Sequence, residues 1–146
     1  MLTQTLIGTI LMLVTVIIHS IGTSIALRWI IAMHRNRPHR TSIVQRSLIV
    51  GAVVIIMFIA TLFESSIWAW TYTFVDAISE FEKALYFSTV TYTTLGYGDI
   101  VLRDEWRLLS AIQAANGAII FGWTTALIII AIKDVSQRLA ELHQLD

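Results

Sequence analysis

The sequence predicts an all-α membrane protein with three transmembrane helices and one short helix that enters the membrane without crossing it. Of the 146 residues, 56% are hydrophobic and 14% are charged, a balance that a soluble domain of this size does not tolerate. Charged residues are absent from residues 1–27, 47–63 and 108–132. Because about 20 apolar residues span the hydrocarbon core as a helix, these stretches predict three spans, the middle one continuing past Glu64 to about Trp70.

The first predicted span, residues 1–33, does not have the features of a secretory signal peptide. It carries no basic segment before the apolar run and no small-residue cleavage motif after it. We therefore expect it to be retained as a peripheral transmembrane helix. His19 lies deep in this span and has two open interpretations: a neutral side chain hydrogen-bonded to a neighbouring helix, or a pH sensor.

A basic loop over residues 34–46 predicts the orientation of the spans. It contains four arginines and no acidic residue, and such loops stay on the cytoplasmic side. In a multi-pass protein of the plasma (bacterial inner) membrane, Met1 is then outside and the C-terminus is cytoplasmic. The external segment between Tyr72 and Trp106 holds six acidic and two basic residues, a charge balance that concentrates cations.

A fourth uncharged stretch, residues 84–98, is too short to span the membrane and is rich in Thr, Ser and Gly. Residues 79–82 have the form of a capping box, in which Ser79 and Glu82 would cap each other's backbone amides. They predict a helix over residues 80–92, about 20 Å long at 1.5 Å per residue. Irregular backbone at that depth is tolerated only inside protein or beside water, so this segment is predicted to be re-entrant.

The residues after this helix can replace the water around a dehydrated cation such as K⁺. That replacement needs carbonyl oxygens that all face one side, whereas an extended strand alternates them. Some residues must therefore take a positive φ, which glycine does without steric cost, and Gly96 and Gly98 stand at alternate positions. The Thr94 hydroxyl can add one more oxygen layer. One chain supplies one wall, and four chains around an axis would give rings of four oxygens at successive levels.

The residues of this segment and of the span that follows it resemble those of a known family. Thr93-Thr94-Leu95-Gly96-Tyr97-Gly98-Asp99 resembles the signature sequence of the potassium channel family. Residues 84–99 resemble its pore helix and selectivity filter, and residues 106–123 are similar to the inner helix of small prokaryotic members. The resemblance extends over residues 48–132 and leaves the first helix outside. It implies a homotetrameric pore of the two-transmembrane-plus-pore-loop type, embedded in membrane lipid, with one extra N-terminal helix.

The resemblance also implies roles for single residues. K⁺ would bind along the filter at Thr94, Leu95, Gly96 and Tyr97, with Gly98 completing the ion-binding segment. Supporting residues would be Thr93, Asp99, Tyr86 and Phe87: Tyr97 would pack behind the filter against Tyr86 or Phe87, and Tyr86 would donate a hydrogen bond to Asp99. Val90 stands where some relatives have a glutamate that pairs with the aspartate.

The predicted organisation places a pore domain at residues 47–132, after the first helix (1–33) and the loop (34–46). The parts of the pore domain are an outer helix (47–70), a pore helix (80–92), a filter (93–99) and an inner helix (107–132). A short cytoplasmic tail (133–146) follows it. In the tail, apolar residues at three- and four-residue spacing are compatible with a short coiled coil or with a frayed helix end.

Several polar and small residues in the spans have alternative interpretations. Asn116 either faces a cavity below the filter or forms an interhelical hydrogen bond. Gly117 and Gly122 either let the inner helix bend, as a gate, or allow close helix packing. Glu64 is expected to have a partner behind the pore helix, Tyr92 or Thr91, as a brace or as a proton sensor.

Composition and motifs argue against other functions. A formal net charge of zero disfavours a nucleic-acid partner. No cysteine, catalytic triad or cluster of metal ligands is evident, so neither an enzyme with a small-molecule substrate nor a cofactor other than the permeant K⁺ is expected. No span has the arginine repeat of a voltage sensor, and the tail is too short for a ligand-binding domain. The alternatives are a poorly selective cation channel of the same architecture and a subunit of a potassium transporter.

Overall fold

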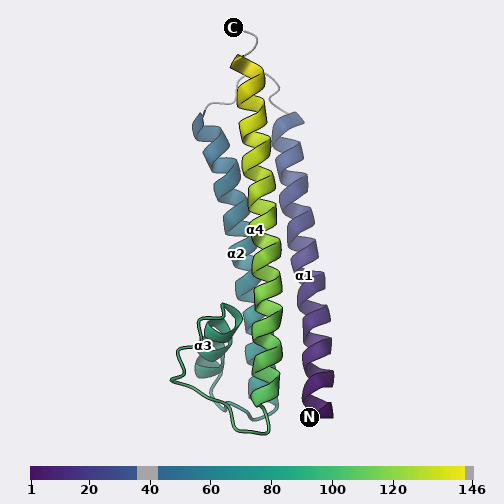
Figure 1. The fold of residues 1–146 in the computed structure, drawn as a ribbon, viewed down its shortest axis with the longest axis vertical. Coiled ribbons are helices and arrows are strands. Elements are labelled where there is room, and N and C mark those ends of the chain that lie inside the picture. Colours follow the sequence, from purple (N-terminus) through teal and green to yellow (C-terminus); the bar gives the residue numbers. More distant parts are fainter. Residues whose placement is uncertain (36–42, 144–146) are drawn as a thin grey trace.

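The computed structural model describes residues 1–35 and 43–143, and over these residues it consists of four helices (Figure 1). They are α1 (Leu2–Arg35), α2 (Ile43–Phe74), α3 (Phe81–Tyr92) and α4 (Arg107–His143). Within the described residues, α1, α2 and α4 are long and apolar enough to cross a membrane. The predicted fold class, an all-α protein with three spans and one short helix, is confirmed. The predicted basic loop includes residues 36–42, which lie outside the described residues.

The short helix α3 lies at one end of the three long helices. Figure 1 shows α1, α2 and α4 running along the long axis, with α3 near the end that holds the N-terminus and far from the C-terminus. Both α1 and α3 pack on α2 and on α4. The helices α2, α3 and α4 form a unit in which each pair is in contact, and α1 packs on this unit through α2 and α4.

One face of α1 is buried against this unit. The buried positions recur every three or four residues, which is the spacing of a single helical face: Gln4, Gly8, Leu11, Thr15, His19, Gly22, Ala26 and Ile30. The opposite face exposes large apolar side chains such as Ile10, Leu13 and Ile17, as a lipid-facing surface does. A Cβ on Gly8 would lie 2.9 Å from the Ile112 side chain, so the glycine lets α1 approach α4 closely.

The helix ends differ from prediction in several places. The helix α2 continues to Phe74 rather than ending near Trp70. The N-cap of α3 is Glu80, with no side-chain capping bond, so the predicted capping box on Ser79 is wrong. The helix begins one residue later than that box requires, and the Glu80 carboxylate pairs with Lys83 Nζ at 2.7 Å instead. The helix α4 begins at the predicted residue and continues through much of the predicted tail to His143.

Two buried apolar clusters hold the helices together. The larger lies around α3 and includes Trp68, Tyr72 and Tyr92 with residues of α4. The smaller lies farther along the bundle, where α1, α2 and α4 meet around Ala26, Met57 and Leu127. The short helix is thus fixed by a core of large aromatic side chains, and this core positions the segment that follows it.

Candidate functional site

The filter segment, residues 93–99, leaves the end of α3 with an unusual backbone. The Leu95 and Gly96 amides both donate to the carbonyl of Val90, at 3.0 and 3.3 Å, so the segment folds back over the helix end. In addition, the backbone angle φ is positive at three alternate residues of the segment: 59° at Thr94, 54° at Gly96 and 79° at Gly98. The predicted positive φ of the two glycines is confirmed.

Thr94 shares this conformation, and the sequence analysis missed it. A positive φ is rare for a β-branched residue and costs energy, so it persists only where the surroundings impose it. The signal was present in the spacing, because Thr94 precedes Gly96 by the same two residues that separate Gly96 from Gly98. Three alternate positive φ values form a continuous pattern through the segment.

The side chains of the filter segment are largely exposed within one chain. Leu95 is 57% exposed and Tyr97 68%. Among the described residues Tyr97 has no ring contact with Tyr86 or Phe87, and its packing behind the filter of a tetramer stays a prediction. Phe87 instead packs edge-on against Tyr72, with ring centroids 5.2 Å apart, because α3 turns this ring toward the buried core.

A hydrogen bond fixes the C-terminal end of the filter segment. The Tyr86 hydroxyl donates to Asp99 Oδ2 at 2.7 Å, as predicted. The acceptor is a carboxylate, and this bond raises the pKa of the Tyr86 hydroxyl, because the bond favours the protonated phenol. The bond joins the middle of α3 to the residue that ends the filter segment.

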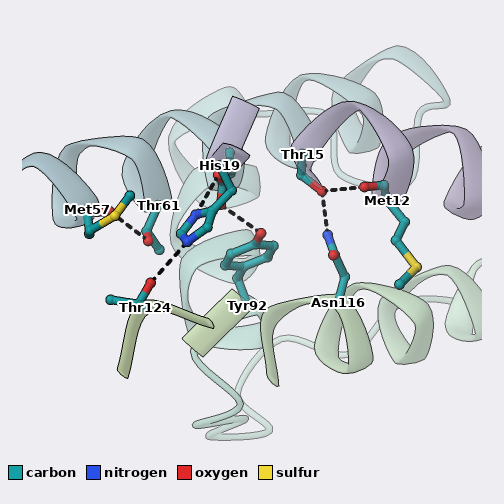
Figure 2. Close-up of polar contacts among 9 residues, drawn as sticks. Met12, Thr15, His19, Met57, Thr61, Tyr92, Asn116 and Thr124 are labelled. Atoms are coloured by element: carbon teal, nitrogen blue, oxygen red, sulfur yellow. Dashed lines mark hydrogen bonds and ion pairs between the residues drawn. The ribbon is translucent and has the colours of Figure 1, made fainter. Parts of the chain in front are cut away.

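The inner end of the segment is held by a chain of buried polar side chains (Figure 2). The Tyr92 hydroxyl donates to Glu64 Oε2 at 2.9 Å, and Glu64 Oε1 lies 3.1 Å from His19 Nδ1. The other ring nitrogen of His19 lies 3.2 Å from the Thr124 hydroxyl. The predicted partner of Glu64 behind α3 is confirmed. For His19, the structure shows the hydrogen-bonded alternative, with partners on both α2 and α4.

Asn116 is fully buried and faces α1. Its amide nitrogen donates to the Thr15 hydroxyl at 2.7 Å, and Thr15 donates in turn to the Met12 carbonyl (Figure 2). The interpretation that Asn116 faces a water-filled cavity is therefore wrong, and the interhelical alternative holds. The physical reason is the position of α1, which covers this face of α4.

The two glycines of α4 have different surroundings. A Cβ on Gly117 would lie 1.9 Å from the Tyr92 carbonyl oxygen, so close packing against the end of α3 requires glycine here. Around Gly122 no such neighbour lies within 4 Å, and the residue is exposed. The packing interpretation therefore accounts for Gly117, and bending at either position stays a prediction.

A second buried network, which the sequence analysis missed, holds the middle of α3. The Ser88 hydroxyl donates to the Ser65 carbonyl at 2.6 Å and accepts from Gln113 Nε2 at 2.6 Å. Gln113 Oε1 accepts from the Tyr72 hydroxyl at 2.7 Å. A glutamine among the apolar residues of a span was the available signal, since polar groups in a membrane helix need partners.

In residues 1–35 and 43–143 no cluster of three or more His, Asp or Glu side chains is arranged to hold a metal ion. Residues 94–98 carry no carboxylate, and their oxygen atoms are the backbone carbonyls and the hydroxyls of Thr94 and Tyr97. Carbonyl and hydroxyl oxygens are ligands that hard cations accept.

Comparison with known families agrees with this geometry. A family model described as "Ion channel" matches residues 48–134, which include most of α2, all of α3, the filter segment and α4 up to its last turns. No curated protein and no solved structure matches the chain. Because the match covers more than half of the chain, including both helices that flank α3, the chain belongs to the ion channel family, of the two-transmembrane, potassium-channel type.

Proposed function

We propose that four copies of the chain form a potassium-selective channel through which K⁺ moves passively down its gradient. The observation that carries this proposal is the alternation of positive φ at Thr94, Gly96 and Gly98. It allows successive carbonyls to turn toward one side. Around a fourfold axis, residues 94–98 of four chains would present rings of oxygens at successive levels. Neighbouring ions repel each other between these levels, so binding is compatible with rapid passage.

The position of α3 supports the same proposal. Its last residue, Tyr92, directly precedes the filter segment, so the negative end of the helix dipole lies beside the inner filter. Four such helix ends directed at one point would favour a cation there. In the proposed orientation α3 enters from outside, and the acidic residues between Tyr72 and Trp106 would attract cations to the mouth.

The exposed surfaces of the chain fit assembly around an axis. Leu95, Tyr97 and Val101 are each more than half exposed, although such side chains are ordinarily covered. One face of α4 is also exposed, and most of its residues are small: Ala111, Ala115, Ala118, Gly122 and Thr125, followed by Ile129. In a tetramer this face of α4 would line the pore below the filter and contact the neighbouring copies. Asn116 lies off this face, and Gly122 lies on it.

The deciding experiment measures selectivity of the purified protein in liposomes or a planar bilayer. Under opposed K⁺ and Na⁺ gradients, we expect the current to reverse near the potassium equilibrium potential. Gly96→Ala should abolish that selectivity or the current itself, because a Cβ is strained at φ 54° although it meets no atom within 4 Å.

Gly51→Ala is the matched control. Gly51 is an exposed helical glycine on α2 with no atom within 4 Å of an added Cβ, so its variant should behave as wild type. A wild-type reversal potential near zero would contradict potassium selectivity and indicate a poorly selective cation channel. Native mass spectrometry of the same samples should give four subunits, and any other number would contradict the tetramer.

A further inference from the structure

We propose that α1 supports the filter, with His19 acting through Glu64 to fix Tyr92 at the point where the filter begins. The inference rests on the proposed function and assigns a role to a helix that the family match does not include, because the match begins at residue 48. His19 is a positioning residue in this proposal: it touches no permeant ion and acts through two other side chains.

Tyr92 determines where the filter segment starts. Tyr92 is the last residue of α3 and is fully buried. Its carbonyl oxygen packs so closely on α4 that a Cβ on Gly117 would lie 1.9 Å away. Its hydroxyl donates to Glu64 on α2. Tyr92 is therefore fixed at both its backbone and its side-chain end, and Thr93 and Thr94 follow directly.

Glu64 depends on α1 for one of its two partners. Both of its carboxyl oxygens are used: Oε2 accepts from Tyr92, and Oε1 lies 3.1 Å from His19 Nδ1. Glu64 and His19 are both 0% exposed. Without His19, Glu64 Oε1 would be buried without a partner inside a membrane span, which is strongly unfavourable. A rotation of Glu64 toward another partner would then take its other oxygen away from Tyr92.

His19 is itself held in place by α4. Its Nε2 lies 3.2 Å from the Thr124 hydroxyl on α4, and its ring packs edge-on to Trp123 with centroids 5.4 Å apart. Figure 2 shows His19 between Tyr92 and Thr124. The imidazole thus connects α1, α2 and α4 at the depth of the filter's inner end. An ordinary packing contact between apolar helices would need none of these polar groups.

The test uses the full chain in liposomes and compares three variants. His19→Leu removes both hydrogen bonds and puts an apolar side chain of comparable size in place of the imidazole. We expect it to form tetramers and to lower the K⁺/Na⁺ permeability ratio by about tenfold, the factor that corresponds to about 1.4 kcal/mol. His19→Asn should recover most of the ratio, because the Asn amide offers a donor and an acceptor about as far from Cα as Nδ1.

Gln4→Leu is the matched control. Gln4 is also buried on α1, and its amide donates to the Glu105 carbonyl, away from Tyr92 and Glu64. Its variant should keep the wild-type permeability ratio. A tetrameric His19→Leu channel with the wild-type ratio would overturn the proposal. So would an equal loss in Gln4→Leu, since that would mean that α1 acts through general packing.

Two further arrangements keep the test decisive. If His19→Leu does not assemble, Tyr92→Phe is used in its place. It removes the hydroxyl at the filter end of the same series of hydrogen bonds and leaves the contact between Glu64 and His19 intact. An unchanged ratio in that variant overturns the proposal, and a lowered ratio supports it. If no current flows, the rise in Tm of the tetramer in KCl over NaCl reports K⁺ binding in its place. A wild-type channel without selectivity would contradict the proposed function itself, whereas a selective wild type with a selective His19→Leu would contradict this inference alone.

Discussion

Two buried polar networks hold α3, and they use different kinds of residue. The network at the middle of the helix, around Ser88 and Gln113, is made of neutral groups on α2, α3 and α4. The network at its C-terminal end contains Glu64 and His19 and reaches α1. The first lies entirely within the residues that match the ion channel family, and the second extends beyond them.

The difference indicates separate roles. Neutral amides and hydroxyls are satisfied by fixed partners, so the Gln113 network braces the outer, inner and short helices as a unit. A buried carboxyl such as Glu64 must be paired, and one of its two partners, His19, lies on the additional helix α1. We therefore expect changes in the neutral network to lower stability, and changes in the network of Glu64 to alter the filter. The predictions below test that division.

The largest effect is expected at Gly117, where the backbone of α4 packs against the last residue of α3. Gly117→Ala would place a Cβ 1.9 Å from the Tyr92 carbonyl oxygen, a backbone atom that cannot move without displacing the filter. We expect loss of the tetramer, or a fall in stability of about 3 kcal/mol or more, as in severe overpacking. Thermal unfolding in detergent and native mass spectrometry measure this. Gly51→Ala is the control, and a stable, selective Gly117→Ala channel would contradict the close approach of α4 to α3.

A smaller effect, on stability rather than selectivity, is expected in the neutral network. Gln113→Leu leaves the hydroxyls of Tyr72 and Ser88 without their amide partner in a buried place. The cost of such unpaired groups is about 1–3 kcal/mol, so the Tm should fall while the K⁺/Na⁺ permeability ratio stays at the wild-type value. Ser110→Ala, which removes a local hydroxyl bond on the same helix, should change neither. A selectivity loss in Gln113→Leu as large as that of His19→Leu would remove the distinction between the two networks.

Much of this architecture followed from the sequence because it depends on local patterns. Uncharged stretches predict spans, and the short uncharged stretch predicted α3. The positive φ of Gly96 and Gly98 followed from what carbonyl coordination requires of a backbone. The Glu64–Tyr92 pair followed from the cost of an unpaired acid in a membrane. In each case one residue type, or one spacing of residues, was enough to predict the local structure.

The features that could not be predicted depend on which helix faces which. The apolar pattern of α1 shows that it spans the membrane, but not that Thr15 would lie against Asn116. That contact decides between a cavity and an interhelical bond, and hydropathy contains no information about it. The N-cap of α3 is Glu80 rather than Ser79, and nothing in the structure explains that shift of one residue. At Asn116, tertiary context decided between two alternatives that local chemistry left open.

The smallest effect is expected at the outer end of the filter, where the hydrogen bond between Tyr86 and Asp99 is exposed. Tyr86→Phe should lower the Tm slightly and leave both buried networks intact. The bond to the Asp99 carboxylate raises the pKa of the Tyr86 hydroxyl above its ordinary value of 10.0. The stabilisation is then fully present below the unfolded-state pKa and is lost as pH rises through the higher folded-state pKa. The Tm difference between wild type and Tyr86→Phe should accordingly be constant at neutral pH and vanish in strongly alkaline buffer. A difference that disappears already near neutral pH would show that another titrating group, rather than this tyrosine, holds the outer end of the filter.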